Sequence, residues 1–238
     1  MTRTLCAVGL MVLCGAVHAQ RAALQPGEYL DSSGGYLVIK SGKADRLPFV
    51  LHTTGVNGHT CDAEGVIGRD GRAVLKPEPQ ITCTLEFAAK GDTVSVDLLG
   101  QCPAYCGARA TLDGTFVKPE PGCDRASVRK ARADFKRHYD RKAYSEARGA
   151  LAPVVERCEK TVNVYDMDWI RNDLAITYLR LGDAAACRNV LQPLAKTAAQ
   201  TDDEIRSDLP PGDAERTIRS ARATRTNLKL CQSAAKGK

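Results

Sequence analysis

Apolar and polar residues alternate along several short segments in the first half of the chain. Between residues 81 and 87, Ile, Cys, Leu and Phe take every second position, and Thr or Glu fills the positions between them. Residues 94–98 repeat the pattern with Val, Val and Leu. Because successive side chains of a strand point to opposite faces, this period of two predicts β-strands with one buried face each.

Turn signals separate these segments at short intervals. Asn57-Gly58 and Asp70-Gly71 are dipeptides of tight hairpin turns, whose backbone needs positive φ angles. We therefore expect an antiparallel meander of about seven or eight strands, folded as a barrel or a sandwich. The first expected strand, at 27–29, and the last, at 110–117, both carry a glycine close to an aromatic residue. We expect these two strands to pair, which would close the sheet and remove its edges.

The second half of the chain changes to a helical pattern. Residues 166–181 begin with an acidic cluster and are followed by Gly182, and residues 213–232 follow a Pro-Pro-Gly turn. Both segments are predicted helices. One face of the first contains Ile170, Leu174, Thr177, Tyr178 and Leu181. We expect Trp169, the single tryptophan of the chain, to be a packing anchor between helices.

The helical half contains an internal repeat with an offset of 40 residues, at which Leu151 matches Leu191 and Pro153 matches Pro193. Segment 173–183, DLAITYLRLGD, resembles the first helix and turn of a tetratricopeptide unit. The repeat departs from that family because its period exceeds about 34 residues. The proline in each second helix predicts a kink or a short helix. The resemblance implies helical hairpins whose concave surface binds a partner.

The start of the chain has the features of an export signal. Residues 1–19 combine one charge, an apolar core and small residues before Gln20. Leu13 precedes Cys14, where a lipid-attachment signal has a small residue, so we expect no lipoprotein. No later segment has 18 consecutive apolar residues, so we expect no transmembrane segment and a soluble, periplasmic or secreted product.

Composition then predicts an α+β protein with two domains, because glycine and β-branched residues give way to Ala, Arg, Leu and Asp at a Pro-rich linker. The expected regions are an export signal at 1–19, a disulfide-bonded antiparallel β domain at 20–118, a linker at 119–122, an all-α tetratricopeptide-like domain at 123–232 and a disordered tail at 233–238.

Eight of the ten cysteines lie after the expected export signal, which indicates a disulfide-bonded protein of an oxidising compartment. In the helical half, antiparallel neighbouring helices would bring their cysteine-bearing ends together. In the β half, a hairpin at Asp70-Gly71 would place Cys61 near Cys83. Cys102 and Cys106 would then pair with each other. The expected pairs are Cys61–Cys83, Cys102–Cys106, Cys123–Cys158 and Cys187–Cys231.

Charge is distributed unevenly along the chain. Residues 20–120 carry 10 Lys or Arg and 12 Asp or Glu, whereas residues 121–238 carry 23 and 16. Four arginines recur every third residue in the last expected helix, which spreads them over about half of its circumference. We expect a solvated face that meets an acidic protein or anionic polymer of the envelope, and no nucleic acid. These residues are Arg216, Arg219, Arg222 and Arg225.

Candidate catalytic or metal-binding residues are few. His52 and His59 flank the Asn57-Gly58 turn with Asp62 nearby, but no third ligand has a matching spacing. The three residues between Cys102 and Cys106 differ from the two of redox dithiols and zinc knuckles. We therefore predict a protein that is not an enzyme and needs no metal or cofactor.

A second resemblance concerns the loop before the last expected strand, where residues 106–110 read CGARA. The exported, disulfide-bonded β domain is distantly similar in architecture to periplasmic inhibitors of C-type lysozyme. Those inhibitors carry a Ser-Gly-x-x-Tyr signature on a protruding loop. Here Cys106 and Ala110 stand at the serine and tyrosine positions, so the inhibitory residues are not retained. The candidate binding residues of this loop are Tyr105 and Arg109.

Together these features predict an exported, non-catalytic binding protein of the cell envelope. Its helical repeats and β-domain loops would hold a protein or peptide partner. One alternative is an inhibitor of a secreted hydrolase such as lysozyme, acting through the β domain. Another is an enzyme with an interdomain site that combines His52 or His59 with Asp residues.

Overall fold

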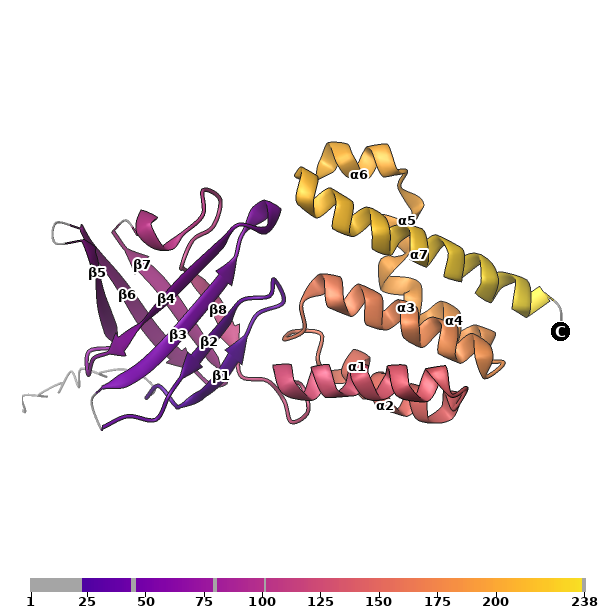
Figure 1. The fold of residues 1–238 in the computed structure, drawn as a ribbon, viewed down its shortest axis with the longest axis horizontal. Coiled ribbons are helices and arrows are strands. Elements are labelled where there is room, and N and C mark those ends of the chain that lie inside the picture. Colours follow the sequence, from indigo (N-terminus) through magenta and orange to yellow (C-terminus); the bar gives the residue numbers. More distant parts are fainter. Residues whose placement is uncertain (1–22, 44–45, 79–80, 101, 237–238) are drawn as a thin grey trace, which may run out of the picture.

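A computed structural model describes residues 23–43, 46–78, 81–100 and 102–236. The expected export signal and Cys14 lie outside these residues. The chain forms an antiparallel β-barrel followed by a set of helices, which confirms the α+β fold class (Figure 1). Among the described residues, no helix has both the length and the apolar character needed to cross a bilayer.

The barrel consists of eight antiparallel strands in the order β4-β3-β2-β1-β8-β7-β6-β5. The first and last strands pair at Leu30 and Val117, as the sequence predicts. This pair lies in the middle of the sheet, however, so its edges are β4 and β5 and the barrel is nearly closed. The strands are β1 Gly27–Leu30, β2 Tyr36–Ile39, β3 Leu47–Thr54, β4 Thr60–Ile67, β5 Arg72–Glu78, β6 Ile81–Lys90, β7 Thr93–Leu99 and β8 Gly114–Val117.

Alternating side chains of these strands fill the interior of the barrel. The rings of Phe49 and Phe87 meet edge to face with centroids 4.9 Å apart, and both side chains are buried. Such a filled interior is usual for a barrel of about eight strands. The apolar residues of the predicted period-two pattern are thus those that face the interior of the barrel.

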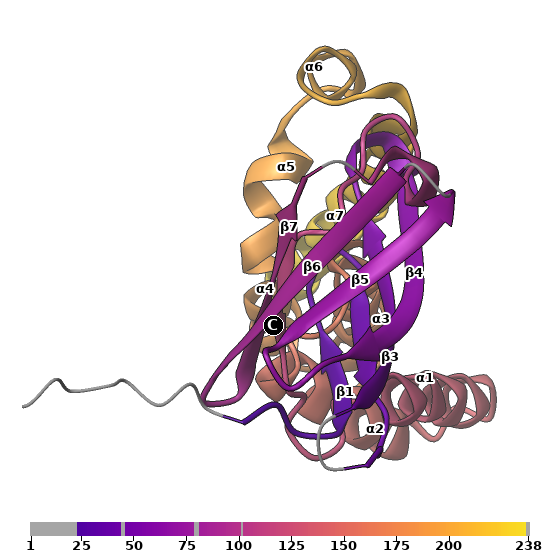
Figure 2. The same cartoon turned by 90° about the vertical axis from the view of Figure 1, so that its left-hand side faces the viewer.

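The two disulfides of the barrel differ from the predicted pairs: Cys61 bonds to Cys106, and Cys83 bonds to Cys102. The prediction was wrong because β4 and β5 do not pair beyond the turn at Gly68–Gly71. Strand β4 pairs with β3, and β5 pairs with β6 (Figure 2). Cys83 lies on β6, which β5 separates from the open edge, and Cys61 and Cys83 each bond to a cysteine of the 102–106 loop.

One loop connects both sides of this open seam. It contains a short 3-10 helix, η2 (Pro103–Tyr105), with a bonded cysteine on each side. Cys106 forms a β-bridge with Cys61 of β4, and the Gly107 amide donates to the Thr60 carbonyl at 2.8 Å. The other disulfide attaches the loop to β6. The loop thus fastens β4 to β6 across the unpaired edges.

The helical region contains two antiparallel hairpins, α1 with α2 and α3 with α4, followed by the long α7, which packs on α3 and α4. Pro193 shortens the second helix of its hairpin as expected, since α4 stops at Leu191 and a 3-10 turn follows. Pro153 does not shorten its helix, because α2 continues through it to Arg157. Helix α7 continues to Lys236, into the segment predicted to be a disordered tail. The helices are α1 Arg125–Asp140, α2 Tyr144–Arg157, α3 Val164–Arg180, α4 Ala184–Leu191, η3 Gln192–Leu194, α5 Ala195–Ala199, α6 Asp202–Asp208 and α7 Pro211–Lys236.

Both predicted disulfides of the helical region are confirmed. Cys123 bonds to Cys158, and Cys187 bonds to Cys231, with Cα atoms 5.2 and 5.8 Å apart. Other expectations need correction. Trp169 is 36% exposed rather than buried between helices, and Leu181 at the end of α3 is 40% exposed. The other residues of the predicted face pack as expected, since Ile170, Leu174 and Thr177 are buried and Tyr178 packs against the core.

The barrel contacts the helical region at several points. The β1–β2 turn docks on the start of α3, where the Asn163 side-chain amide donates to the Ser33 carbonyl at 2.8 Å. Gly34 is needed there because a Cβ would lie 2.5 Å from the Asn163 amide nitrogen, and its φ is +102°. Beside this contact, Arg125 of α1 pairs with Glu28 at 2.5 Å and lies over the Tyr36 ring.

Candidate binding site in the helical region

A cavity of about 450 Å³ lies between α3, α5, α6 and α7. Its volume is within the range of about 300 to 1,000 Å³ that ligand sites occupy. The lining combines apolar side chains with hydroxyl, amide and carboxyl groups. The residues are Val164, Tyr165, Asp168, Pro193, Leu194, Thr197, Gln200, Ile205, Asp208, Leu209, Thr217, Ser220, Ala221 and Thr224.

Local sequence features place α6 over this cavity. Thr201 and Glu204 form a capping box, in which the Glu204 amide donates to the Thr201 hydroxyl and the Glu204 carboxylate accepts from the Thr201 amide. This arrangement begins a helix immediately after α5. Leu209 and Pro210 then end α6, and α7 begins at Pro211. Two chain reversals thus hold the short α6 beside the first turns of α7 (Figure 1).

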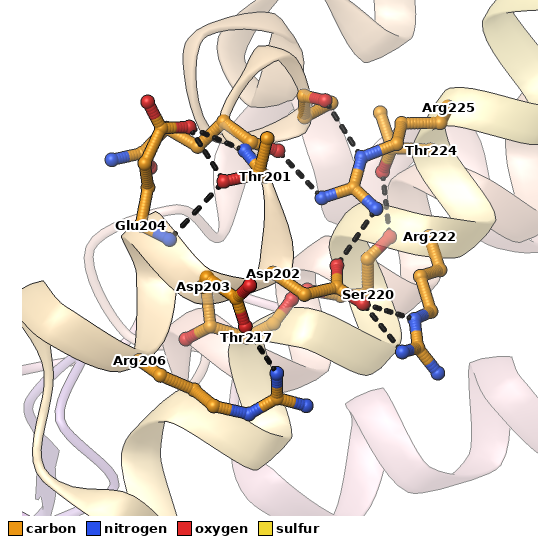
Figure 3. Close-up of polar contacts among 12 residues, drawn as sticks. Thr201, Asp202, Asp203, Glu204, Arg206, Thr217, Ser220, Arg222, Thr224 and Arg225 are labelled. Carbon is orange, nitrogen blue, oxygen red and sulfur yellow. Dashed lines mark hydrogen bonds and ion pairs between the residues drawn. The ribbon is translucent and has the colours of Figure 1, made fainter.

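Arginines of α7 hold the α5–α6 connection in place (Figure 3). Arg225 donates to the carbonyls of Ala198 and Gln200 at 2.9 and 2.7 Å and pairs with Asp202 at 2.9 Å. Arg222 pairs with the other oxygen of Asp202. Hydrogen bonds from the two guanidinium groups hold the pKa of the Asp202 carboxyl below its ordinary value. Both arginines therefore stabilise the wall of the cavity.

The four predicted arginine candidates do not form one solvated face. Arg222 and Arg225 are engaged with Asp202, and Arg216 pairs with Asp213 at 3.1 Å and lies over the Tyr165 ring. Arg219 is exposed, and its side chain makes no polar contact with the part of the chain that the structure describes. Three of the four thus have partners within the protein.

Asp168 is the innermost charged group in the cavity lining. Its Oδ2 accepts a hydrogen bond from the Ser220 hydroxyl at 3.1 Å. Burial raises the pKa of the Asp168 carboxyl above its ordinary value, and the Ser220 hydrogen bond and the positive charge of Arg171 oppose this effect. A half-buried carboxylate with one protein donor still favours a cationic neighbour.

Hydroxyl groups line the α7 side of the cavity. Thr217, Ser220 and Thr224 share one face of the helix because they are three and four residues apart. Thr224 hydrogen-bonds the buried Asn172 at 3.0 Å, and Asn172 accepts from Asn227 at 2.9 Å. This buried network fixes α7 on α3 and thereby the floor of the cavity.

Neither candidate residue of the barrel loop, Tyr105 or Arg109, is among the lining residues of the cavity. Tyr105 packs against the barrel core, whereas Arg109 is exposed. The Arg109 carbonyl lies close to Gly55, and the Arg216 guanidinium lies close to Gly58. The segment between these two glycines therefore separates the β-loop candidate from the arginines of α7.

The two candidate histidines, His52 and His59, have different neighbours in the structure. His52 Nδ1 lies 2.7 Å from Asp62 Oδ1, and its ring stacks on Tyr36 with centroids 5.1 Å apart. His59 instead lies beside Gly107. Within the described residues, no group of three or more His, Cys, Asp or Glu side chains is arranged to hold a metal ion. The His52–Asp62 contact joins opposite positions of β3 and β4 on the outside of the barrel.

A second cavity, of about 250 Å³, lies between the β1–β2 turn, α1 and the start of α3. Two of its three arginines are engaged, because Arg125 pairs with Glu28 and Arg132 pairs with Asp166 at 2.6 Å. One ion pair thus joins the barrel to α1, and the other joins α1 to α3.

Sequence reasoning missed the larger cavity. Its lining comes from segments 164–168, 193–209 and 217–224, which no local pattern joins. One signal was available: Thr217, Ser220 and Thr224 fall on a single side of a predicted helix, and that side includes buried positions. The chain matches no protein-family model, no curated protein and no solved structure.

Proposed function

We propose that this protein is an exported, non-catalytic binding protein of the cell envelope whose helical region holds a protein or peptide partner. The observation that carries the proposal is the cavity between α3 and α5–α7. Apolar groups such as Val164 and Leu209 line it together with directional hydrogen-bonding groups such as Ser220 and Thr217. This mixture is typical of sites that recognise a ligand by shape and a few polar contacts.

Features of the sequence support the proposed compartment and the proposed type of partner. The pattern of residues 1–19 favours export, and four disulfides indicate folding in an oxidising compartment, with the periplasm or the exterior as the destination. The tetratricopeptide resemblance of 173–183 favours a peptide or protein partner over a small metabolite, since such helical repeats bind extended partners.

The test is a peptide array derived from envelope proteins, probed with the full chain under oxidising conditions. Val164 is 49% exposed at the rim of the cavity, so Val164→Trp would obstruct the cavity. Leu230→Trp is the matched control, because Leu230 is 45% exposed on α7 and does not line the cavity. We expect captured peptides to lose binding to the first variant only. Equal capture by both variants would place binding elsewhere.

A second candidate function is inhibition of a secreted hydrolase through the barrel. It is favoured by the 102–113 loop, which two disulfides attach to β4 and β6 and which presents the exposed Arg109. A constrained loop loses little entropy on binding. In a cell-wall lysis assay with C-type lysozyme, Arg109→Glu should reduce inhibition, and Lys90→Glu on another exposed hairpin should not. No inhibition by the unmodified protein would dismiss this candidate.

A further inference from the structure

We infer that the cavity between α3 and α5–α7 receives a lysine or arginine side chain, so that the partner is a basic peptide segment. This inference rests on the proposed binding function and specifies its ligand. The observation behind it is the charge of the lining. Asp168 and Asp208 carry its carboxylates, and no Lys or Arg is among the described lining residues.

The absence of basic groups from the lining is notable because the chain is basic overall, with 34 Lys or Arg and 28 Asp or Glu. Nearby arginines pair with other carboxylates: Arg222 and Arg225 bind Asp202, and Arg216 binds Asp213. Arg171, whose positive charge acts on Asp168, pairs with Glu159 at 3.0 Å. The carboxylates of Asp168 and Asp208 would therefore repel an anionic ligand and attract a cation. The basic partner inferred for this cavity differs from the acidic partner that the arginines of the last helix suggest.

The carboxylates are placed at different depths. Asp168 is half-buried, and its Oδ2 accepts from Ser220, while its Oδ1 accepts no hydrogen bond from the described residues. Asp208 is exposed at the outer side and accepts from Gln200 at 2.9 Å. A cationic side chain could therefore pass Asp208 and donate to Asp168 Oδ1. Charge-assisted hydrogen bonds of this kind are stronger than neutral ones.

The remaining lining suits the rest of a long basic side chain. Lysine and arginine have apolar methylene stems, which pack well on aliphatic surfaces. Val164, Pro193, Leu194 and Leu209 supply such surfaces. An ammonium group has three donors and needs further acceptors, and the Thr217 hydroxyl is one of the groups that can accept. Carboxylate, hydroxyl and aliphatic groups together thus match a cation on an apolar stem.

The test uses fluorescein-labelled pentapeptides Gly-Leu-X-Leu-Gly, with X as lysine, arginine, Nε-acetyl-lysine or glutamate, and fluorescence anisotropy with the full chain. We expect the lysine and arginine peptides to bind at least about tenfold more tightly than the other two, which is the scale of one charge-assisted hydrogen bond. Asp168→Asn should remove most of this preference. Asp203→Asn is the matched control, because Asp203 lies on α6, pairs with Arg206 and does not line the cavity.

Several outcomes would overturn the inference. One is equal binding of the glutamate or acetyl-lysine peptide, and another is an unchanged preference in Asp168→Asn, provided that circular dichroism shows the variant folded. If that variant does not fold, Val164→Trp must abolish binding of the lysine peptide, and retained binding counts against the inference. Nα-acetyl-lysine amide binding as tightly as the peptide would identify a small-amine site, and self-association that competes with the peptide would identify a second copy.

The two proposals fail separately. If envelope peptides bind in a manner sensitive to Val164→Trp but carry no basic residue, the binding function stands and the cationic ligand is wrong. If no captured peptide is sensitive to Val164→Trp, the binding function itself is wrong at this site.

Discussion

The backbone amide of Asn57, in the barrel, donates a hydrogen bond to the carboxylate of Asp213, in the first turn of α7, at 2.7 Å. The Asn57 side-chain carbonyl in turn accepts from the Gly212 amide at 2.7 Å. These two hydrogen bonds have the arrangement of a capping box, in which the side chain of the capping residue accepts from a helix amide and an acidic side chain of the first turn accepts from the amide of the capping residue. Here the capping residue lies on another part of the fold, so the barrel fixes the start of the helix that lines the cavity.

We predict that Asn57→Gly lowers the free energy of unfolding by about 1 kcal/mol, because the Gly212 amide loses its acceptor. Asn57→Ala should lower it further, since Asn57 has a φ of +64° and alanine disfavours that conformation. Urea unfolding measures both, and amide hydrogen exchange at Gly212 reports the cap directly. Equal stability of both variants and the wild type would show that the cap does not stabilise the fold.

Removing the Cys187–Cys231 disulfide by a double alanine substitution should cost about 3 to 4 kcal/mol, because the bridge closes a long loop of 44 residues. Removing the Cys123–Cys158 bridge, whose cysteines are 35 residues apart in the sequence, should lower the free energy of unfolding by a similar amount. Non-reducing peptide mapping checks the pairs, and thermal unfolding checks the cost. Recovery of a Cys158–Cys187 peptide would contradict the helix directions.

Arg225→Ala should destabilise the protein by about 1 to 3 kcal/mol, because the substitution leaves two carbonyls without a donor and removes one ion pair. Arg219→Ala should change stability by no more than about 0.5 kcal/mol, since its side chain is exposed. Chemical denaturation of the two variants measures this difference. A similar loss in both would mean that Arg225 does not hold the α5–α6 connection.

The ion pairs of Asp202 predict a dependence on pH. Because its pKa is lowered in the folded protein, its contribution to stability is present above the unfolded pKa and is lost as the pH falls through the folded pKa. The destabilisation caused by Asp202→Asn should therefore shrink between pH 7 and strongly acidic conditions. Denaturation midpoints across this range provide the measurement, and a constant difference would argue against the ion pairs.

For Asp168 we predict a pH dependence of stability with the opposite sign to that of Asp202. Its raised pKa means that the folded protein holds the proton more tightly, so stability is favoured below the unfolded pKa and decreases as the pH rises through the folded pKa. Asp168→Asn, which resembles the protonated form, should be more stable than the wild type at pH 7 and similar to it in acid. Melting temperatures at both pH values decide this, with Asp203→Asn as the exposed control. A less stable variant at pH 7 would show that the ionised carboxylate holds a structural contact.

Local sequence patterns were enough to predict the types of the helices and strands and much of their order. Hairpin dipeptides such as Asp70-Gly71 and the period-two pattern of 81–87 are local signals, and a strand or turn responds to them wherever it lies. Two helical disulfides were also predictable, because antiparallel neighbouring helices place their ends together, as for Cys187 and Cys231. These features depend on geometry within one or two adjacent elements.

The pairing of the barrel cysteines, the directions of the arginine side chains and the cavity depend on tertiary packing and could not be predicted from local patterns. Cys61 and Cys83 each bond to the 102–106 loop, and β4 does not pair with β5 after their shared turn. Arg225 turns inward because α6 brings Asp202 to it, from 23 residues away. Both outcomes depend on how distant segments pack, and side-chain periodicity within a single element contains no information about that packing.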